Sequence, residues 1–226
     1  MTRIPFTVYD FFAYLSSGGL VVAAVDYTFG YQWLLLHRIG LPLGLLLTFL
    51  AYISGHVVAH FSSFFLEQLL VHRLLRSPSR CLLGEGPPQY LSRLFPGYYR
   101  ALPAVTRERI RQRAASMGAQ NVAGESLFLH AYAVVARDKD SQDRLDEFRN
   151  LYGFARNMTL SFMVTFLVFL AGTSFRGLPP SGVWSLLSLG FGVVMLYRYL
   201  KFFRQFSYQL LITYAELPRR LVEQSA

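Results

Sequence analysis

The sequence predicts an all-α fold: a four-helix transmembrane protein whose second and fourth helices extend into a helical cytoplasmic domain. Three observations support this prediction. The 226 residues are 53% hydrophobic and 16% aromatic, which is too apolar for an ordinary soluble domain of this length. The 22 Lys and Arg residues lie almost entirely outside the apolar segments. No segment shows the alternation of apolar and polar residues that is typical of a half-buried strand.

Four apolar segments meet the length of about 17 to 25 residues that a hydrocarbon core about 30 Å thick requires. They are residues 11–30, 41–65, 158–175 and 182–199. The first segment lacks the n-region and the small-residue cleavage site of a removable signal peptide, so we expect it to stay in the mature chain.

The chain is therefore expected to divide into three regions. The first is a transmembrane hairpin with a cytoplasmic extension, the second is a basic helical cytoplasmic domain, and the third is another transmembrane hairpin with a helical tail. These regions are residues 1–75, 76–156 and 157–226.

The distribution of basic residues predicts the orientation. Residues 73–156 contain 14 Lys and Arg, residues 198–220 contain five, and Arg3 precedes the first apolar segment. The other two loops contain only Arg38 and Arg176. Because Lys and Arg are enriched in loops on the cytoplasmic side, we expect the N-terminus, the C-terminus and the middle region to be cytoplasmic.

The middle region shows helical periodicity. Residues 106–118 and 124–138 are expected to form helices, with Thr106 as the N-cap of the first. A third helix, from residue 141, is expected to continue into the third membrane segment. By contrast, prolines and glycines mark residues 84–103 as a loop.

Two of the membrane helices are expected to be longer than the bilayer requires. A helix over residues 41–76 would be about 54 Å long at about 1.5 Å per residue. The helix over residues 182–217 behaves in the same way. We expect both to project into the cytoplasm and to pack with the helices of the middle region.

The second segment contains a polar stripe formed by His56, His60, Ser63 and Glu67. These residues fall within about 60° of one another when each residue advances by about 100°. Ionisable residues in membrane helices usually face a bundle interior or a water-filled cavity, so the stripe could line a pore, a proton path or a gate. The alternative is interhelical hydrogen bonding, with Glu67 near the headgroups.

No metal or cofactor is expected. His56 and His60 could share one ion, but Glu67 lies about 10 Å further along the helix, so another chain would have to complete the site. The single cysteine, Cys81, excludes an internal disulfide and any CxxC motif. No Walker A loop, nucleophile elbow or HExxH motif is present, so we do not expect an enzyme.

Asp26 is the other carboxylate within a membrane segment. It could form a vestibule or pair with Arg38, or it could be an interfacial residue reached by water. Small residues at positions 16–19 of the same segment, and at 185, 188, 190 and 192 of the fourth, would allow helices to approach closely.

The basic region has three explanations. Its arginines could bind a nucleotide or an oligonucleotide through phosphate groups, they could hold anionic lipid headgroups, or they could only enforce topology. The arginines concerned are Arg93, Arg100, Arg107, Arg109, Arg111 and Arg113.

Three stretches carry a family resemblance: PFTVYDFFAYLSSGG, FRNLYGFARNM and YRYLKFFRQFSYQLLITYAE. They resemble small bacterial multi-pass membrane proteins, some of which are similar to channel-type effectors of anti-phage defence. The resemblance implies a homo-oligomeric pore in the bacterial inner membrane, opened by a cytoplasmic signal that the helical domain senses. It transfers no site residues.

Two functions from different classes follow. The first is a homo-oligomeric ion channel or membrane-disrupting effector, gated through the basic domain. The second is a non-conducting scaffold in the lipid bilayer that recruits a cytoplasmic protein partner. A lipid-modifying enzyme is a distant third.

Overall fold

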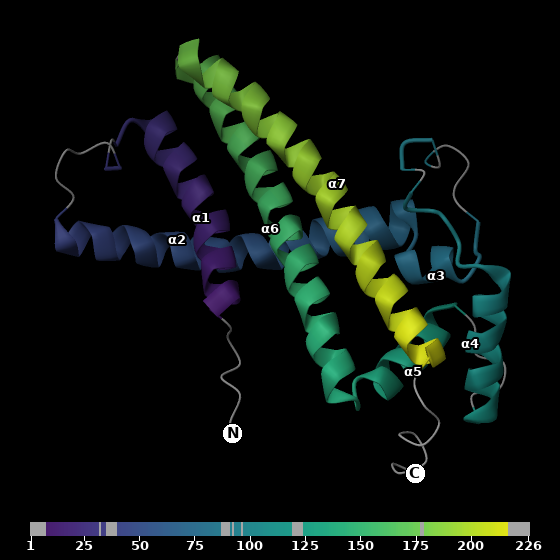
Figure 1. Cartoon of the computed structure of the whole chain (residues 1–226). Coiled ribbons are helices and arrows are strands. Elements are labelled where there is room, and N and C mark those ends of the chain that lie inside the picture. Colours follow the sequence, from purple (N-terminus) through teal and green to yellow (C-terminus); the bar gives the residue numbers. More distant parts are fainter. Residues whose placement is uncertain are drawn as a thin grey trace. The chain divides into compact units, whose positions relative to one another are not determined.

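The computed structural model describes residues 8–31, 33–34, 40–86, 91, 93–95, 97–118, 124–176 and 179–216. Within these ranges the chain forms helices and no strand (Figure 1), which confirms the predicted all-α class. Four helices are long and apolar enough to cross a membrane. Among the described residues they cover the four apolar segments identified in the sequence to within one residue: Asp10–Phe29, Leu41–Leu82, Lys139–Ser174 and Gly182–Glu216.

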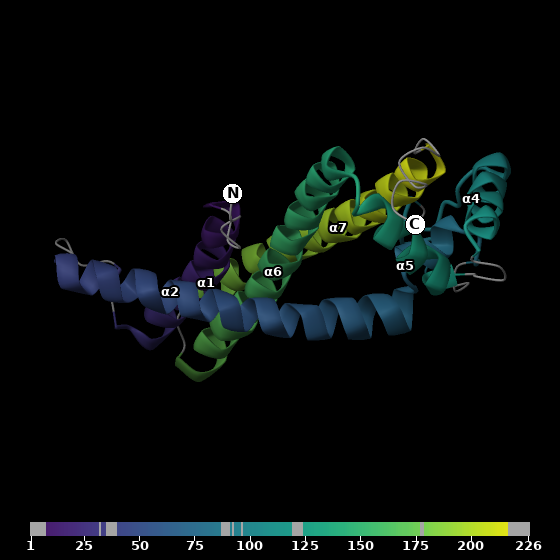
Figure 2. The ribbon, with the colours of Figure 1, turned by 90° about the horizontal axis from the view of Figure 1, so that it is seen from below.

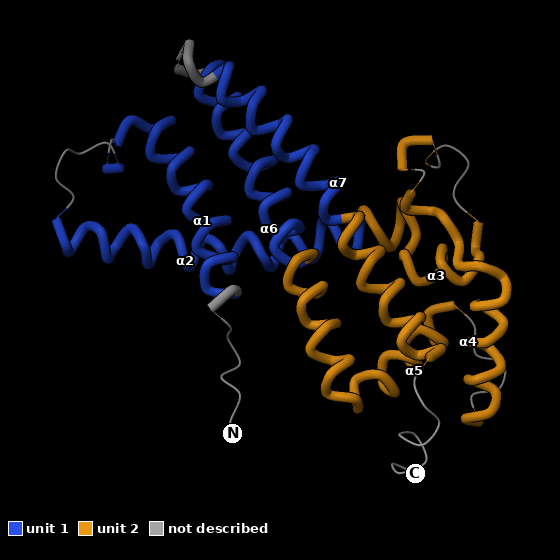
Figure 3. Tube along the Cα trace, in the orientation of Figure 1, with its two compact units in different colours: residues 1–69, 153–199 blue, residues 70–152, 200–226 orange. Residues whose placement is uncertain are grey.

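The chain forms two compact units (Figure 3). Unit 1 comprises Met1–Leu69 and Gly153–Tyr199, and unit 2 comprises Leu70–Tyr152 and Leu200–Ala226. Most of the basic middle region belongs to unit 2, together with the last part of the fourth long helix. The boundary therefore falls inside helices rather than in linkers.

In unit 1, α1 (Val8–Phe29) crosses α2 (Leu41–Ser62) (Figure 1, Figure 2). Glycines make this crossing possible. A Cβ atom on Gly18 would lie 1.8 Å from the carbonyl oxygen of Ala51, and one on Gly55 would lie 1.9 Å from that of Tyr14. The two backbones are therefore in direct contact, as is common where small residues meet between membrane helices.

The other two long helices of unit 1 form an antiparallel pair. They are α6 (Lys139–Arg176) and α7 (Pro179–Glu216). Ser185 donates a hydrogen bond of 3.2 Å to the carbonyl oxygen of Phe166, and the rings of Phe162 and Phe191 stack with centroids 5.5 Å apart. Proline is tolerated at the start of α7 because the first turn of a helix lacks intrahelical N–H partners.

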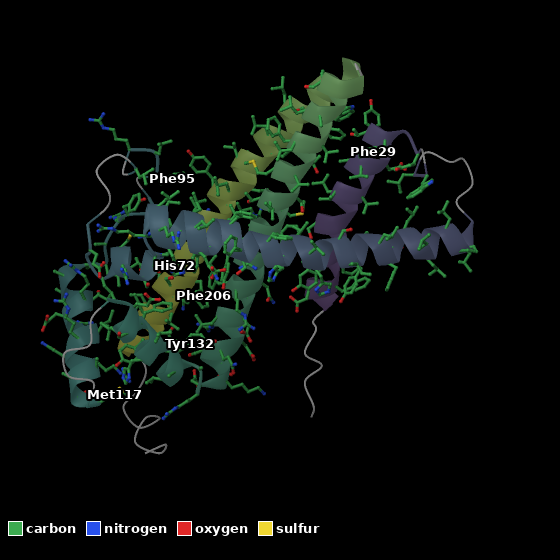
Figure 4. All side chains as sticks on the ribbon, turned by 180° about the vertical axis from the view of Figure 1, so that it is seen from behind. Phe29, His72, Phe95, Met117, Tyr132 and Phe206 are labelled. Carbon is green, nitrogen blue, oxygen red and sulfur yellow. The ribbon has the colours of Figure 1, made fainter. Side chains whose placement is uncertain are left out.

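Side chains in unit 1 are distributed in the opposite way to those of a soluble protein. Small and polar side chains are buried: Ser17, Ser62, Asn157, Ser161, Thr165 and Ser185. Large apolar ones are exposed, including Leu45, Phe49, Ile53, Leu167, Leu186, Phe191 and Val194. In Figure 4 the sticks on unit 1 are almost all carbon, whereas nitrogen and oxygen gather around unit 2. This distribution is expected when lipid is the solvent.

The helix that begins at Leu41 changes geometry at Ser63. From Ser63 to Leu75 it is a π-helix, η1, of 13 residues. A π-helix is normally a single turn and is often found at functional sites. The predicted helix over residues 41–76 is thus continuous almost to its expected end, but its last third does not have the α-helical spacing that the prediction assumed.

The helix ends at Arg76, whose φ of 66° lies in the left-handed region. Such a conformation is unfavourable for a residue with a Cβ atom. Here it is held by the surroundings, because the Arg76 carbonyl accepts a hydrogen bond of 2.8 Å from the Tyr98 hydroxyl. The Arg76 guanidinium also donates to the carbonyl oxygen of Gly86 at 2.6 Å.

Unit 2 has an apolar core of the usual soluble type. It contains α3 (Pro78–Leu82), α4 (Ala104–Ser116) and α5 (Gly124–Val135), together with parts of η1, α6 and α7. Its buried residues include Leu75, Leu82, Ile110, Leu127, Ala131, Val135, Leu210 and Leu211. The helices expected at 106–118 and 124–138 are confirmed with small shifts. Thr106 is not the N-cap, because α4 begins two residues earlier, after Pro103.

Candidate functional site

His56 lies at the crossing of α1 and α2. Its imidazole stacks on the ring of Tyr14 with centroids 4.1 Å apart and meets the ring of Tyr52 edge-on at 4.6 Å. The side chain is half-buried between these two rings. Its packing therefore gives His56 a structural role within the chain.

His60, one turn further along α2, is exposed. Its ring touches that of Phe61 at a centroid distance of 5.7 Å, and it has no hydrogen bond with any described residue of the chain. No group of three or more His, Cys, Asp or Glu residues able to hold a metal occurs in the described part. An imidazole on an otherwise apolar membrane surface requires a partner from outside the chain or access to water.

Ser63 and Glu67 belong to a different environment. The Ser63 hydroxyl donates to the Glu67 carboxylate at 3.4 Å, and this carboxylate forms an ion pair with the guanidinium of Arg156 on α6. The π-helical spacing from Ser63 onward turns Glu67 away from the position that α-helical spacing predicts. The four residues of the predicted stripe are therefore not brought together.

A polar cluster between α2 and α6 takes the place of the stripe. It contains Ser62, Ser63, Glu67, Arg156 and Asn157. The Ser62 hydroxyl donates a buried hydrogen bond of 2.7 Å to Oδ1 of Asn157. The side chains of Arg156 and Glu67 are only 16% and 24% exposed, so their ion pair is partly desolvated, and removing one partner costs more than it does in a surface pair. We refer to these five residues as the α2–α6 polar cluster.

Sequence reasoning missed the two members on α6. Arg156 was counted only as one of the basic residues that set the orientation, and Asn157 was not considered. The available signal was the position of adjacent Arg and Asn residues at the start of an apolar segment. That signal indicates a polar contact but not its partner, because Glu67 lies 89 residues away in the chain.

Asp26 is buried at 4% exposure. Its two carboxylate oxygens accept hydrogen bonds from the backbone N–H groups of Trp33 and Leu34, at 3.0 and 3.2 Å. Asp26 therefore fixes the chain reversal that follows α1. This arrangement differs from both a vestibule and an interfacial residue in contact with water. The proposed partner Arg38 lies outside the described residues.

The basic region does not present its arginines as one surface. The side chains of Arg93, Arg100 and Arg109 are exposed. The backbone carbonyl of Arg100 accepts a hydrogen bond of 2.7 Å from Arg204 on α7. These three arginines have the exposure that topology or lipid contact requires.

Arg113 is a packing residue. Its guanidinium lies 5.4 Å from the centroid of the Tyr214 ring and donates a hydrogen bond of 3.3 Å to the carbonyl oxygen of Ala215. A cation near the last carbonyl groups of a helix stabilises them. Arg113 thus joins α4 to the end of α7, so Arg109 and Arg113 do not form a shared ligand site although they are four residues apart.

Arg107 and Arg111 line a cavity of about 200 Å³ in unit 2. Its other lining residues are Leu83, Gly84, Glu85, Gly124 and Leu127. A second cavity, of about 470 Å³, shares Glu85 and Gly124 with the first and also contacts Arg80, Glu125, Ser126 and Leu129. Of the six predicted arginines, these two are the ones that the structure places together at a cavity.

Comparisons with protein-family models, with curated proteins and with solved structures find no match for this chain.

Proposed function

We propose that this chain is a homo-oligomeric ion channel or membrane-disrupting effector of the bacterial inner membrane, controlled through unit 2. The observation that carries the proposal is the exposure of His60 on α2. Val57, Phe61 and Phe64 around it are 49%, 48% and 46% exposed, so the imidazole lies on an apolar surface. An ionisable group is costly in contact with lipid. A second copy of the chain, or a water-filled path between copies, removes this cost.

The polar cluster supports control through unit 2. Glu67 and Arg156 lie close to the points where η1 and α6 pass from unit 1 into unit 2. The helices are continuous across these points, as is α7. A movement of η1 or α6 in unit 2 would therefore act on the ion pair and on the neighbouring Ser62–Asn157 hydrogen bond. In such a mechanism the cluster holds α2 and α6 in one of two arrangements.

The proposed topology places both termini and the middle region in the cytoplasm. Although α2 crosses α1, it has the character of a spanning helix, because an interfacial helix needs one strongly polar face and α2 exposes apolar side chains at Leu41, Leu45, Leu46 and Phe49. Reporter fusions after residues 38 and 176 should therefore read periplasmic, and fusions at residues 118 and 220 should read cytoplasmic. A periplasmic reading at residue 118 would contradict the topology.

Ion flux through liposomes tests the channel. The wild-type protein is expected to release a trapped ion, and His60→Leu should change the rate several-fold while membrane insertion is retained, because the substitution removes a polar group from an apolar surface. His56→Phe is the matched control: it keeps an aromatic ring against Tyr14 and should leave the flux unchanged. A wild-type protein that inserts but conducts nothing would favour the non-conducting scaffold.

A further inference from the structure

Arg107 and Gly84 lie side by side at the smaller cavity. Gly84 has a φ of +102°, and a Cβ atom on it would lie 2.1 Å from Nη1 of Arg107. The backbone conformation therefore favours glycine at this position. The Arg107 guanidinium lies beside Gly84, and both residues line the cavity.

Two arginines line this cavity beside a single carboxylate, that of Glu85. Arg107 and Arg111 are four residues apart on α4 and so share one face of the helix. Neither forms an ion pair with a carboxylate of the described residues. Nε of Arg107 is buried and, among those residues, has no hydrogen-bond partner. This buried donor lies out of reach of a ligand, but the guanidinium groups that line the cavity favour an anion there through charge-assisted hydrogen bonds.

The beginning of α5 also lines the smaller cavity. This helix starts at Gly124, and the first turn of a helix carries N–H groups without intrahelical partners and a partial positive charge. Its first-turn Glu125 is already paired with Arg80 at 3.2 Å. Like the two arginines, the first turn of α5 therefore attracts an anion. Phosphate is the anion most often bound by this combination.

Glu85 indicates which chemical groups the rest of the ligand carries. Its carboxylate lies beside Gly124, where a Cβ atom would be 3.0 Å from Oε1, and it lines both cavities. A carboxylate accepts hydrogen bonds from hydroxyl groups, as an acidic residue does with ribose. The smaller cavity, of about 200 Å³, has room for a phosphate group, and the larger one, of about 470 Å³, has room for the remainder of a small molecule.

We propose that unit 2 binds a small phosphate monoester with a hydroxylated organic part, of nucleoside monophosphate size, with its phosphate between Arg107 and Arg111 and its hydroxyl groups at Glu85. This proposal rests on the proposed function in one respect: the ligand is taken to be the signal to which unit 2 responds. The same phosphate chemistry occurs in lipid headgroups, so the test separates the two sources.

Calorimetry on the full-length protein in a neutral detergent, without anionic lipid, measures the binding. Adenosine monophosphate is expected to bind, and adenosine and inorganic phosphate more weakly. Arg107→Gln with Arg111→Gln should weaken the binding of adenosine monophosphate about tenfold or more, since charge-assisted hydrogen bonds to the phosphate are lost. Arg93→Gln with Arg109→Gln changes the net charge equally at exposed sites and should have little effect.

Each alternative outcome contradicts the proposal. Equal loss in both double variants would show a general effect of net charge. Binding of inorganic phosphate as strong as that of adenosine monophosphate would remove the role of Glu85. Capture by phosphatidylglycerol vesicles without binding of adenosine monophosphate would assign the arginines to lipid. Arg111→Gln alone, at an exposed side chain, repeats the test if the Arg107 variant does not fold. Because binding is measured without ion flux, it can succeed or fail independently of the channel.

Discussion

Gly18→Leu is expected to abolish the packing of α1 on α2. The new Cβ atom would lie 1.8 Å from the carbonyl oxygen of Ala51 and 2.3 Å from the backbone nitrogen of Gly55. Both are backbone atoms that no rotamer change can move, so the helices must separate. We expect a loss of about 3 kcal/mol or more, at or beyond the upper end of the cost of overpacking. Size-exclusion chromatography after stepwise heating in detergent measures the loss.

Gly190→Leu provides the control for this substitution. It introduces the same side chain into α7, where a Cβ atom would meet nothing within 4 Å. The variant should therefore elute and melt as the wild type does. Equal stability of the two leucine variants would show that α1 and α2 do not cross at Gly18.

Arg156→Gln is expected to have the second largest effect. The substitution leaves the Glu67 carboxylate, which is only 24% exposed, without its cation. Breaking a fully buried ion pair costs about 3–5 kcal/mol, and partial exposure reduces this, so we expect a loss of about 2 kcal/mol. The loss should appear as a lower melting temperature and as altered ion flux, since the pair joins η1 to α6.

A double-mutant cycle with Glu67→Gln isolates the pair from other effects. The double variant should recover part of the stability that Arg156→Gln loses, because no unpaired charge remains. Arg149→Gln is the matched control. Arg149 forms an ion pair of 3.2 Å with Asp146 three residues away, with the two side chains 52% and 32% exposed, and such pairs are worth little. Additive losses in the cycle would show that Glu67 and Arg156 do not interact.

The membrane helices and the helices of unit 2 could be predicted because they depend on local patterns. Apolar length identifies the segments that contain α1, α2, α6 and α7, and Gly124 and the periodic residues after it identify α5. The all-α class follows from the same signals. The charge distribution predicts orientation independently of how the helices pack.

The sites were less predictable because they depend on register and on distant partners. The predicted stripe assumes α-helical spacing of about 100° per residue. No sequence pattern in this segment predicts the π-helical geometry that begins at Ser63. Arg113 belongs to the predicted basic region by composition alone, whereas its position is set by Tyr214 and Ala215, about a hundred residues later. The Asp26 carboxylate accepts hydrogen bonds from two backbone N–H groups that follow α1. No side-chain motif predicts such a contact.

The opposite distribution of side chains in the two units has a thermodynamic consequence. Water drives the burial of Leu82, Ile110 and Leu127 in unit 2, so urea, which solvates apolar groups, weakens that core. In unit 1 the large apolar side chains face outward, and the hydrophobic effect does not hold its helices together once lipid or detergent covers them. The chain therefore has no single free energy of unfolding. A urea titration reports on unit 2, whereas a change of detergent reports on unit 1.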